Sequence, residues 1–153
     1  IQANDLVGRK TSRDGGQTAK GIAQQIAQTE VALAQRSSAH SQAVAKRLKA
    51  AREAFEATVD FIAANTSSNP NAAFAGSVPY LMLAGNLMAG WQLARSLIVA
   101  EDLLSKGEDK AFLQAKITTA RFYADHILSK VPGVALSITQ GADSVTEMAL
   151  DAF

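Results

Sequence analysis

Apolar residues recur every three or four positions along almost the whole chain from Gln17 onward, and this spacing most constrains the fold. Such a period places apolar side chains on one side of an α-helix, whereas a half-buried strand would need strict alternation. No segment alternates in that way. Proline is scarce, with 3 residues in 153, and aromatic residues make up only 6%, as is typical of helical chains. The sequence therefore predicts an all-α protein.

Polar, glycine-rich or proline-containing connectors divide this pattern into long segments. After a short helical stub near 1–10 and a turn at Asp14-Gly15-Gly16, helices are predicted over about 17–36, 39–64, 72–105, 109–131 and 134–150. Residues that can cap a helix stand at three of the starts, namely Ser37-Ser38, Asn69-Pro70 and Asp109. Pro79 predicts a kink or break between 75 and 79, and Pro132-Gly133 is expected to stop the fourth long helix. Long helices joined by short connectors favour an up-and-down antiparallel bundle of four to five helices.

Each predicted helix has its own apolar stripe. The expected core residues are Ile22, Ile26, Leu33, Val44, Leu48, Phe55, Val59, Ile62, Leu113, Ile117, Ala120, Ala124, Ile127, Val131, Val134, Ile138, Val145 and Met148. Gly85 with Ala89, and separately Gly141, occupy positions where we expect a neighbouring helix to approach closely.

Within residues 72–105, the most apolar part of the chain, lies the segment from Tyr80 to Ala100. Its length would suit a membrane span, but Asn86, Gln92 and Arg95 interrupt it. An arginine near the middle of a span costs at least about 2.5 kcal/mol in lipid. We therefore expect a central bundle helix surrounded by neighbours on most sides, and no membrane partner.

Residue types that carry chemistry are few and poorly spaced for it. The absence of cysteine excludes disulfides, thiol catalysis and thiolate metal sites. His40 and His126 do not lie three residues after a glutamate, so the Glu-x-x-His pair of di-iron bundles is missing. Both histidines are expected to be surface or helix-end residues.

Carboxylates that lie close in sequence also favour structural roles. Glu53, Glu56 and Asp60 share a helix face, but lysine and arginine alternate with them, which favours a solvated face with the i,i+4 pairs Lys49–Glu53 and Arg52–Glu56. Glu101 and Asp102 are adjacent and so diverge by about 100° around a helix, which is not the geometry of a shared-proton pair.

Neither a phosphate loop nor a nucleic-acid surface is predicted. Gly15-Gly16 follows no strand, and the Gly85 to Gly90 spacing lacks the Lys-Ser of a P-loop. A basic group on the second long helix has acidic neighbours and no interleaved aromatic residues; it comprises Lys46, Arg47, Lys49 and Arg52. The net charge of +1 adds no general preference for polyanions.

Two stretches resemble a known family. The start, Ile1-Gln2-Ala3-Asn4-Asp5-Leu6-Val7-Gly8-Arg9-Lys10 with Arg13-Asp14-Gly15-Gly16, resembles the segment after the catalytic loop of long bacterial acyl-CoA dehydrogenases. The stretches from Asn69 to Leu81, from Gly90 to Arg95 and from Arg121 to Ala124 resemble the acetyl-CoA dehydrogenase C-terminal-like domain found in relatives that act on 3-methylthiopropionyl-CoA.

The resemblance implies that residues 1–16 are the end of an upstream dehydrogenase domain with a linker, and that residues 17–153 form a C-terminal helical bundle domain. The family's catalytic glutamate and most of its FAD-binding and CoA-binding positions would precede Ile1. The resemblance therefore implies no catalytic, cofactor-binding or metal-binding residue in this chain, while the parent enzyme would use FAD. Arg95 matches a Trp-x-x-Ala-Arg pattern and is expected to be structural, pairing with a carboxylate of another helix or of the missing body.

The resulting hypothesis is a non-catalytic fragment, expected to be cytoplasmic and homo-oligomeric, whose partner is the upstream domain. The first residue, Ile rather than Met, fits this expectation of a piece of a longer protein. The alternatives are a free-standing module that binds a partner helix or an acyl chain near Met82, Met88 and Trp91, and a lipid-interacting helix at 80–100.

Overall fold

The computed structural model describes the backbone of residues 1–152 and, except at residues 146 and 150, their side chains. Its α-helices are α1 (Gln2–Asp5), α2 (Gln17–Ala34), α3 (Ala39–Asn65), α4 (Pro70–Ala75), α5 (Ser77–Ser105), α6 (Lys110–His126), α7 (Val131–Gln140) and α8 (Ala142–Thr146). A π-helical turn (Leu6–Thr11) and 3₁₀ turns (Ser12–Asp14, Leu128–Lys130, Leu150–Ala152) complete the described elements. No strand occurs in this part of the chain, and the all-α prediction is confirmed.

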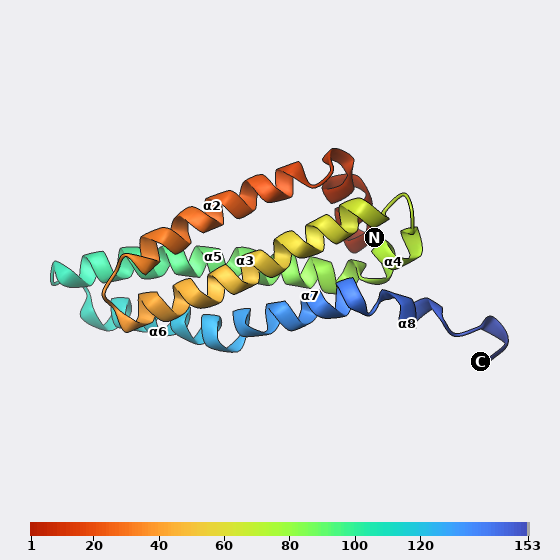
Figure 1. The fold of residues 1–153 in the computed structure, drawn as a ribbon. Helices are drawn as coiled ribbons and strands as arrows, with labels where there is room; N and C mark the ends of the chain where they lie inside the picture. Colours follow the sequence, from red (N-terminus) through yellow and green to blue (C-terminus); the bar gives the residue numbers. More distant parts are fainter. Residues whose placement is uncertain (153) are drawn as a thin grey trace.

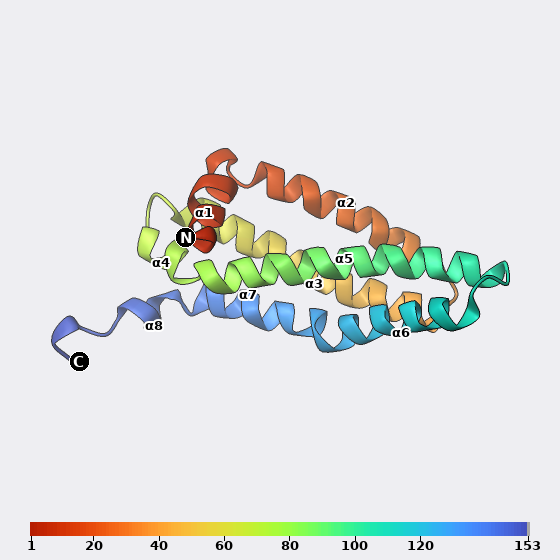
Figure 2. The same cartoon turned by 180° about the vertical axis from the view of Figure 1, so that it is seen from behind.

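Four antiparallel rods make up the body of the molecule (Figures 1 and 2). They are α2, α3, α5, and the rod that α6 and α7 form end to end. Helix α3 lies in front in Figure 1 and helix α5 lies in front in Figure 2, so their outer faces point in opposite directions. As predicted, α5 contacts α2, α3, α6 and α7, but its outer face is left without a neighbour.

The predicted apolar stripes meet between the rods. Side chains that are at most 6% exposed include Ile26, Leu33, Val44, Leu48, Phe55, Val59, Ile62, Leu113, Ile117, Ala120, Ala124, Val131 and Ile138. Three predicted helix starts are also confirmed, since Ser38, Asn69 and Asp109 each accept a hydrogen bond from a backbone N–H of the helix that follows. The predicted break before Pro79 lies at Gly76, between α4 and α5.

The end of the fourth long helix differs from the prediction. Helix α6 ends at His126, and the chain makes a 3₁₀ turn before α7 begins at Val131. Pro132 therefore lies in the first turn of α7 and does not stop a helix. The first backbone N–H groups of a helix have no partner within it, so proline costs no hydrogen bond there.

The predicted last helix, 134–150, is also too long. Helix α7 ends at Gln140, and α8 is a separate short helix. Val145 and Met148, predicted as core residues, are 66% and 60% exposed. Gly141 directly follows α7, and a Cβ at this position would first meet that helix, 2.5 Å from the carbonyl oxygen of Ser137, rather than a neighbouring one.

The close approach on α5 is at a different glycine from the one predicted. Gly85 and Ala89 are exposed, and a Cβ on Gly85 would meet nothing within 4 Å. Gly90 is buried instead, and a Cβ there would lie 2.6 Å from Cδ2 of Leu128. The sequence showed two small residues four apart, but the rotation of α5 about its axis turned that pair to the outside.

Residues 1–16 pack against the bundle at the beginning of α5. Val7 is fully buried, and the hydroxyl groups of Thr11 and Tyr80 form a buried hydrogen bond of 2.9 Å. The predicted turn at Gly15-Gly16 is present, with φ values of +64° and +84°. Glycine has no Cβ and adopts this left-handed backbone without a steric clash. Among the described helices, none combines the length and hydropathy needed to cross a membrane.

Candidate functional site

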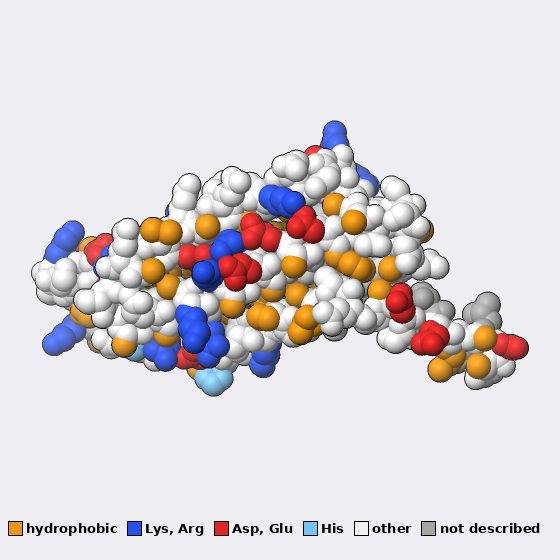
Figure 3. All heavy atoms as spheres, in the orientation of Figure 1, with side chains coloured by type: hydrophobic (Ala, Val, Ile, Leu, Met, Phe, Trp, Pro, Cys, Tyr) orange, Lys and Arg blue, Asp and Glu red, His pale blue; other side chains and the backbone are white. Residues whose placement is uncertain are grey.

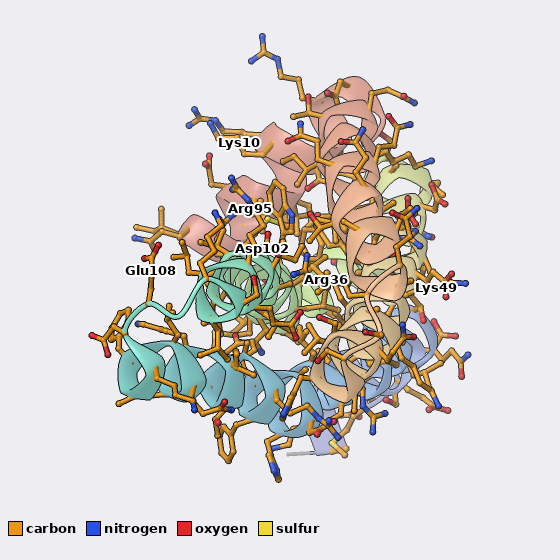
Figure 4. The ribbon with its side chains drawn as sticks, turned by 90° about the vertical axis from the view of Figure 1, so that its left-hand side faces the viewer. Lys10, Arg36, Lys49, Arg95, Asp102 and Glu108 are labelled. Atoms are coloured by element: carbon orange, nitrogen blue, oxygen red, sulfur yellow. The ribbon has the colours of Figure 1, made fainter. Side chains whose placement is uncertain are left out.

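One cluster of charged side chains joins the turn between α2 and α3 to the end of α5. Nε of Arg36 donates to Oε2 of Glu101 at 2.7 Å, and Nη2 of Arg36 donates to the carboxylate of Asp102. Thus Glu101 and Asp102, although they diverge around the helix, meet on the same guanidinium. Figure 4 shows Arg36 and Asp102 side by side in the view along the bundle.

The carboxylate of Glu101 is partly buried in this cluster. Burial opposes its ionisation, but hydrogen bonds from Ser38, Arg36 and Ser41 outweigh burial and lower its pKa. The hydroxyl of Ser41 donates to Oε2 at 2.9 Å. This arrangement keeps the carboxylate ionised and attached to the α2–α3 turn, which is a structural task.

His40 borders an open recess of about 410 Å³ next to this cluster, together with Gln114 and Ile117. Its Nδ1 is buried and has no hydrogen-bond partner in the described structure. His126 is exposed at the end of α6 and packs against the ring of Phe122 at 4.4 Å between centroids. The two histidines lie on different helices and share no cluster with three or more potential metal ligands; indeed no such cluster occurs within residues 1–152.

A second charged cluster joins α2 to α3. Arg52 donates from Nε to Glu30 at 2.8 Å and from Nη1 to Glu56 at 2.5 Å. The side chains of Arg52 and Glu30 are only 13% and 9% exposed. The pKa of Arg52 is raised, first by its hydrogen bond to Glu30. Because the two residues lie 22 positions apart on different helices, sequence spacing gave no indication of this pair.

The acidic face predicted on α3 is covered by cations. The predicted Lys49–Glu53 and Arg52–Glu56 pairs are both present, at 3.9 Å and 2.5 Å, and Asp60 pairs with Lys20 of α2 at 2.5 Å. Figure 3 shows these opposite charges interspersed along the α2 and α3 side of the molecule. The solvated-face interpretation of Glu53, Glu56 and Asp60 therefore agrees with the structure.

The same face contains the basic group. Arg47 lies 3.5 Å from Asp125, a residue that Arg121 also binds at 2.5 Å. The hydrogen bond from Arg121 is the largest of the effects that lower the pKa of Asp125. With Lys49 and Arg52 also paired, most of this basic group is bound to carboxylates of the chain itself rather than presented to phosphate.

The opposite side of the molecule, around α5, has a different character. Arg95 is exposed and has no carboxylate partner within the described residues, so of the two expected pairings the one with another helix is not present there. Its guanidinium donates to Oε1 of Gln92 at 2.9 Å and lies 5.7 Å from the centre of the Trp91 ring. Of the three residues named for the alternative interaction module, Met82 is 58% exposed, whereas Met88 and Trp91 are half-buried. The Trp91 indole N–H donates to Thr29 of α2 at 2.8 Å.

A small apolar recess opens between α2, α5 and the amino-terminal turns. It measures about 210 Å³ and is lined mainly by apolar side chains, including Leu6, Ile22 and Met88. Tyr80 lies at its wall, where burial raises the pKa of the phenol and the Thr11 hydrogen bond partly opposes that rise. Lys10 lies at its edge, on the α5 side of the bundle in Figure 4.

Comparison with known proteins agrees with the resemblance seen in the sequence. Residues 19–149 match the family model described as "Acetyl-CoA dehydrogenase C-terminal like". The chain belongs to this family. It is also 49% identical, over 150 residues, to a protein of Ruegeria pomeroyi named 3-methylmercaptopropionyl-CoA dehydrogenase. That match covers 98% of this chain but only 25% of the length of the relative.

Proposed function

We propose that this chain is the C-terminal helical domain of a FAD-dependent acyl-CoA dehydrogenase and that its own task is structural. The match to a dehydrogenase in which it covers a quarter of the length carries the proposal. The parent enzyme would remove hydrogen from the α and β carbons of an acyl-CoA, with the flavin as hydride acceptor. The relative's name points to a short thioether-containing acyl group as the substrate class.

The apolar recess and the partly buried arginines of this chain are poorly suited to a flavin. The apolar recess of about 210 Å³ is small for a tricyclic ring and offers little polar surface. Arg36 and Arg52, which have the planar cationic groups suited to a pyrophosphate, are bound to carboxylates. We therefore propose that flavin binding and the catalytic base belong to the rest of the parent protein, and we derive no step of the reaction from this domain.

The charged clusters support a structural task. Arg36 ties the α2–α3 turn to α5, and Arg52 ties α2 to α3. Both ion pairs fix the positions of neighbouring helices relative to one another, which the connecting loops alone would allow to shift. A rigid bundle of this kind would hold its outer faces in place for contacts with the catalytic body and for subunit contacts in a homo-oligomer of the parent enzyme.

The reading frame that encodes the chain tests this proposal directly. We expect it to continue upstream of Ile1 into a flavin-binding dehydrogenase domain, and we expect the protein made from the whole frame to bind FAD and oxidise an acyl-CoA. A frame that encodes only this bundle would contradict the proposal and would favour a free-standing interaction module. Fractionation of the cells into cytoplasm, membranes and other compartments, each followed with a marker protein, checks the expectation of a cytoplasmic protein.

A further inference from the structure

The outer face of α5 is apolar, uncharged and without a neighbour. From Ser77 to Ala94 the helix contains no Asp, Glu, Lys or Arg. Its exposed positions step by four and three residues along one side and form what we call the α5 face: Val78, Met82, Gly85, Ala89, Gln92, Ser96 and Val99. Val78, Met82 and Val99 are 62%, 58% and 55% exposed.

Such a face is unusual for a surface helix of a soluble domain, whose outer side is normally charged or strongly polar. The outer side of α3 in the same molecule follows that rule, with Lys49, Glu53 and Asp60 exposed to water. The difference between the two helices indicates that the α5 face has a protein neighbour in the functional assembly.

The borders of the α5 face indicate the chemistry of that neighbour. Lys10 and Arg95 lie on this side of the bundle, and neither has a carboxylate partner among residues 1–152 (Figure 4). Lys116 on α6 lies over the ring of Phe112, at 5.1 Å, beside an open groove of about 500 Å³ between α5 and α6. Cations around an apolar centre favour a partner surface that is apolar in the middle and carries carboxylates at its edge.

The position of the amino terminus indicates which protein this neighbour is. The turns formed by residues 1–11 pack against the beginning of α5, so a domain joined to Ile1 would start beside the α5 face (Figure 2). The matched region accounts for only 25% of the relative's length, so most of the relative lies outside this domain and is large enough to cover the α5 face. A covalent connection to that body would give it a high effective concentration at α5.

We propose that the α5 face is the surface on which this domain docks onto the catalytic body of its own polypeptide. The apolar recess bounded by Leu6, Ile22 and Met88 would receive an apolar side chain of that body, and Arg95 would bind one of its carboxylates. The inference rests on the proposed function, since it requires that a dehydrogenase body precede Ile1.

Because the chain has no cysteine, single introduced thiols report on the docking surface. We would compare Ala89→Cys, at the centre of the α5 face, with Ala57→Cys, which replaces an alanine that is also exposed, on the outer side of α3. Each variant is made in the 153-residue chain and in the protein encoded by the whole reading frame. The measured quantity is the rate at which a maleimide adds to the introduced cysteine, which is followed by mass spectrometry of the peptide that contains this cysteine.

In the 153-residue chain both thiols should react at similar rates. In the whole protein the thiol from Ala89→Cys should react at about one tenth of that rate or below, because the docked body would block the access of the reagent. The thiol from Ala57→Cys should keep its rate. Equal rates at the two positions in the whole protein would overturn the inference. Protection of position 89 that appears already in the 153-residue chain and grows with its concentration would instead assign the face to a second copy.

This experiment also separates the two proposals. If the whole protein binds flavin and is active but position 89 stays reactive, the docking surface is wrong and the proposed function stands. If no flavin-binding domain is encoded upstream of Ile1, the proposed function fails first and the docking inference fails with it.

Discussion

Two glycines on α5, only five residues apart, should respond oppositely to the same substitution. Gly90 is buried beneath Leu128, whereas Gly85 is exposed with nothing within 4 Å of where a Cβ would lie. Gly85→Ala should therefore show only the gain in helix propensity, which stabilises a helix by about 0.8–1.0 kcal/mol. Gly90→Ala has the same gain but also introduces a methyl group into a filled space.

The structure gives the size of the opposing effect. A Cβ at Gly90 would lie 2.6, 2.7 and 2.9 Å from Cδ2, Cδ1 and Cγ of Leu128, so the whole isobutyl group must move. Leu128 is only 1% exposed and has little room to do so. Overpacking of this kind costs about 1–3 kcal/mol. Gly90→Ala should therefore be less stable than Gly85→Ala by about 1–3 kcal/mol, because helix propensity cancels between the two variants.

Urea denaturation followed by circular dichroism measures both free energies of unfolding. The double variant Gly90→Ala with Leu128→Ala serves as the steric control. The added methyl should be less harmful once the isobutyl group is gone, so the double variant should be more stable than the sum of the two single changes predicts. If Gly90→Ala proves as stable as Gly85→Ala, the close contact between α5 and the turn at Leu128 is wrong.

Three further changes test the charged clusters and a helix cap. Glu30→Gln leaves the largely buried guanidinium of Arg52 short of a partner and should cost about 3 kcal/mol of unfolding free energy, whereas the exposed control Glu53→Gln should stay within about 0.5 kcal/mol. Equal effects of the two substitutions would argue against a largely buried pair. The pKa of Glu101 is lower in the folded chain than in the unfolded chain, where it is about 4.3. The ionised carboxylate therefore stabilises the fold above the unfolded-state pKa, and this contribution disappears as the pH falls through the folded-state pKa. In thermal melts the Glu101→Gln variant should therefore have a lower Tm than the unsubstituted chain at pH 7, and the difference in Tm should shrink in acid. A difference in Tm that does not depend on pH would contradict this. Ser38→Ala removes the side-chain cap of α3 and should cost about 1 kcal/mol in the same denaturation assay, and an unchanged stability would show that the cap contributes nothing.

The sequence was a good guide wherever local rules decide the structure. Apolar spacing located the four rods, and side-chain oxygens at Ser38, Asn69 and Asp109 marked helix starts because such caps act within three residues. Pro132 was misread because proline is acceptable in a first helical turn as well as after a last one. Only the packing of Leu128 and Val131 into the core decides between these two positions.

The sequence was a poor guide wherever the rotation of one helix against another decides. The exposure of Met82, Gly85 and Ala89 follows from which side α5 turns toward the bundle, and an apolar helix gives few local signs of that choice. The Glu30–Arg52 and Arg36–Glu101 pairs also join residues far apart in the chain, so no spacing rule could reveal them. The family resemblance, in contrast, was visible in continuous sequence and is confirmed by the match over residues 19–149.

The most direct test of the central claim is to measure flavin binding and acyl-CoA oxidation by the purified 153-residue chain beside the protein encoded by the whole reading frame. The account predicts a folded helical chain with no bound FAD and no turnover, and a yellow, active protein from the whole frame. Stoichiometric FAD with turnover in the 153-residue chain alone would contradict the claim that this domain is structural.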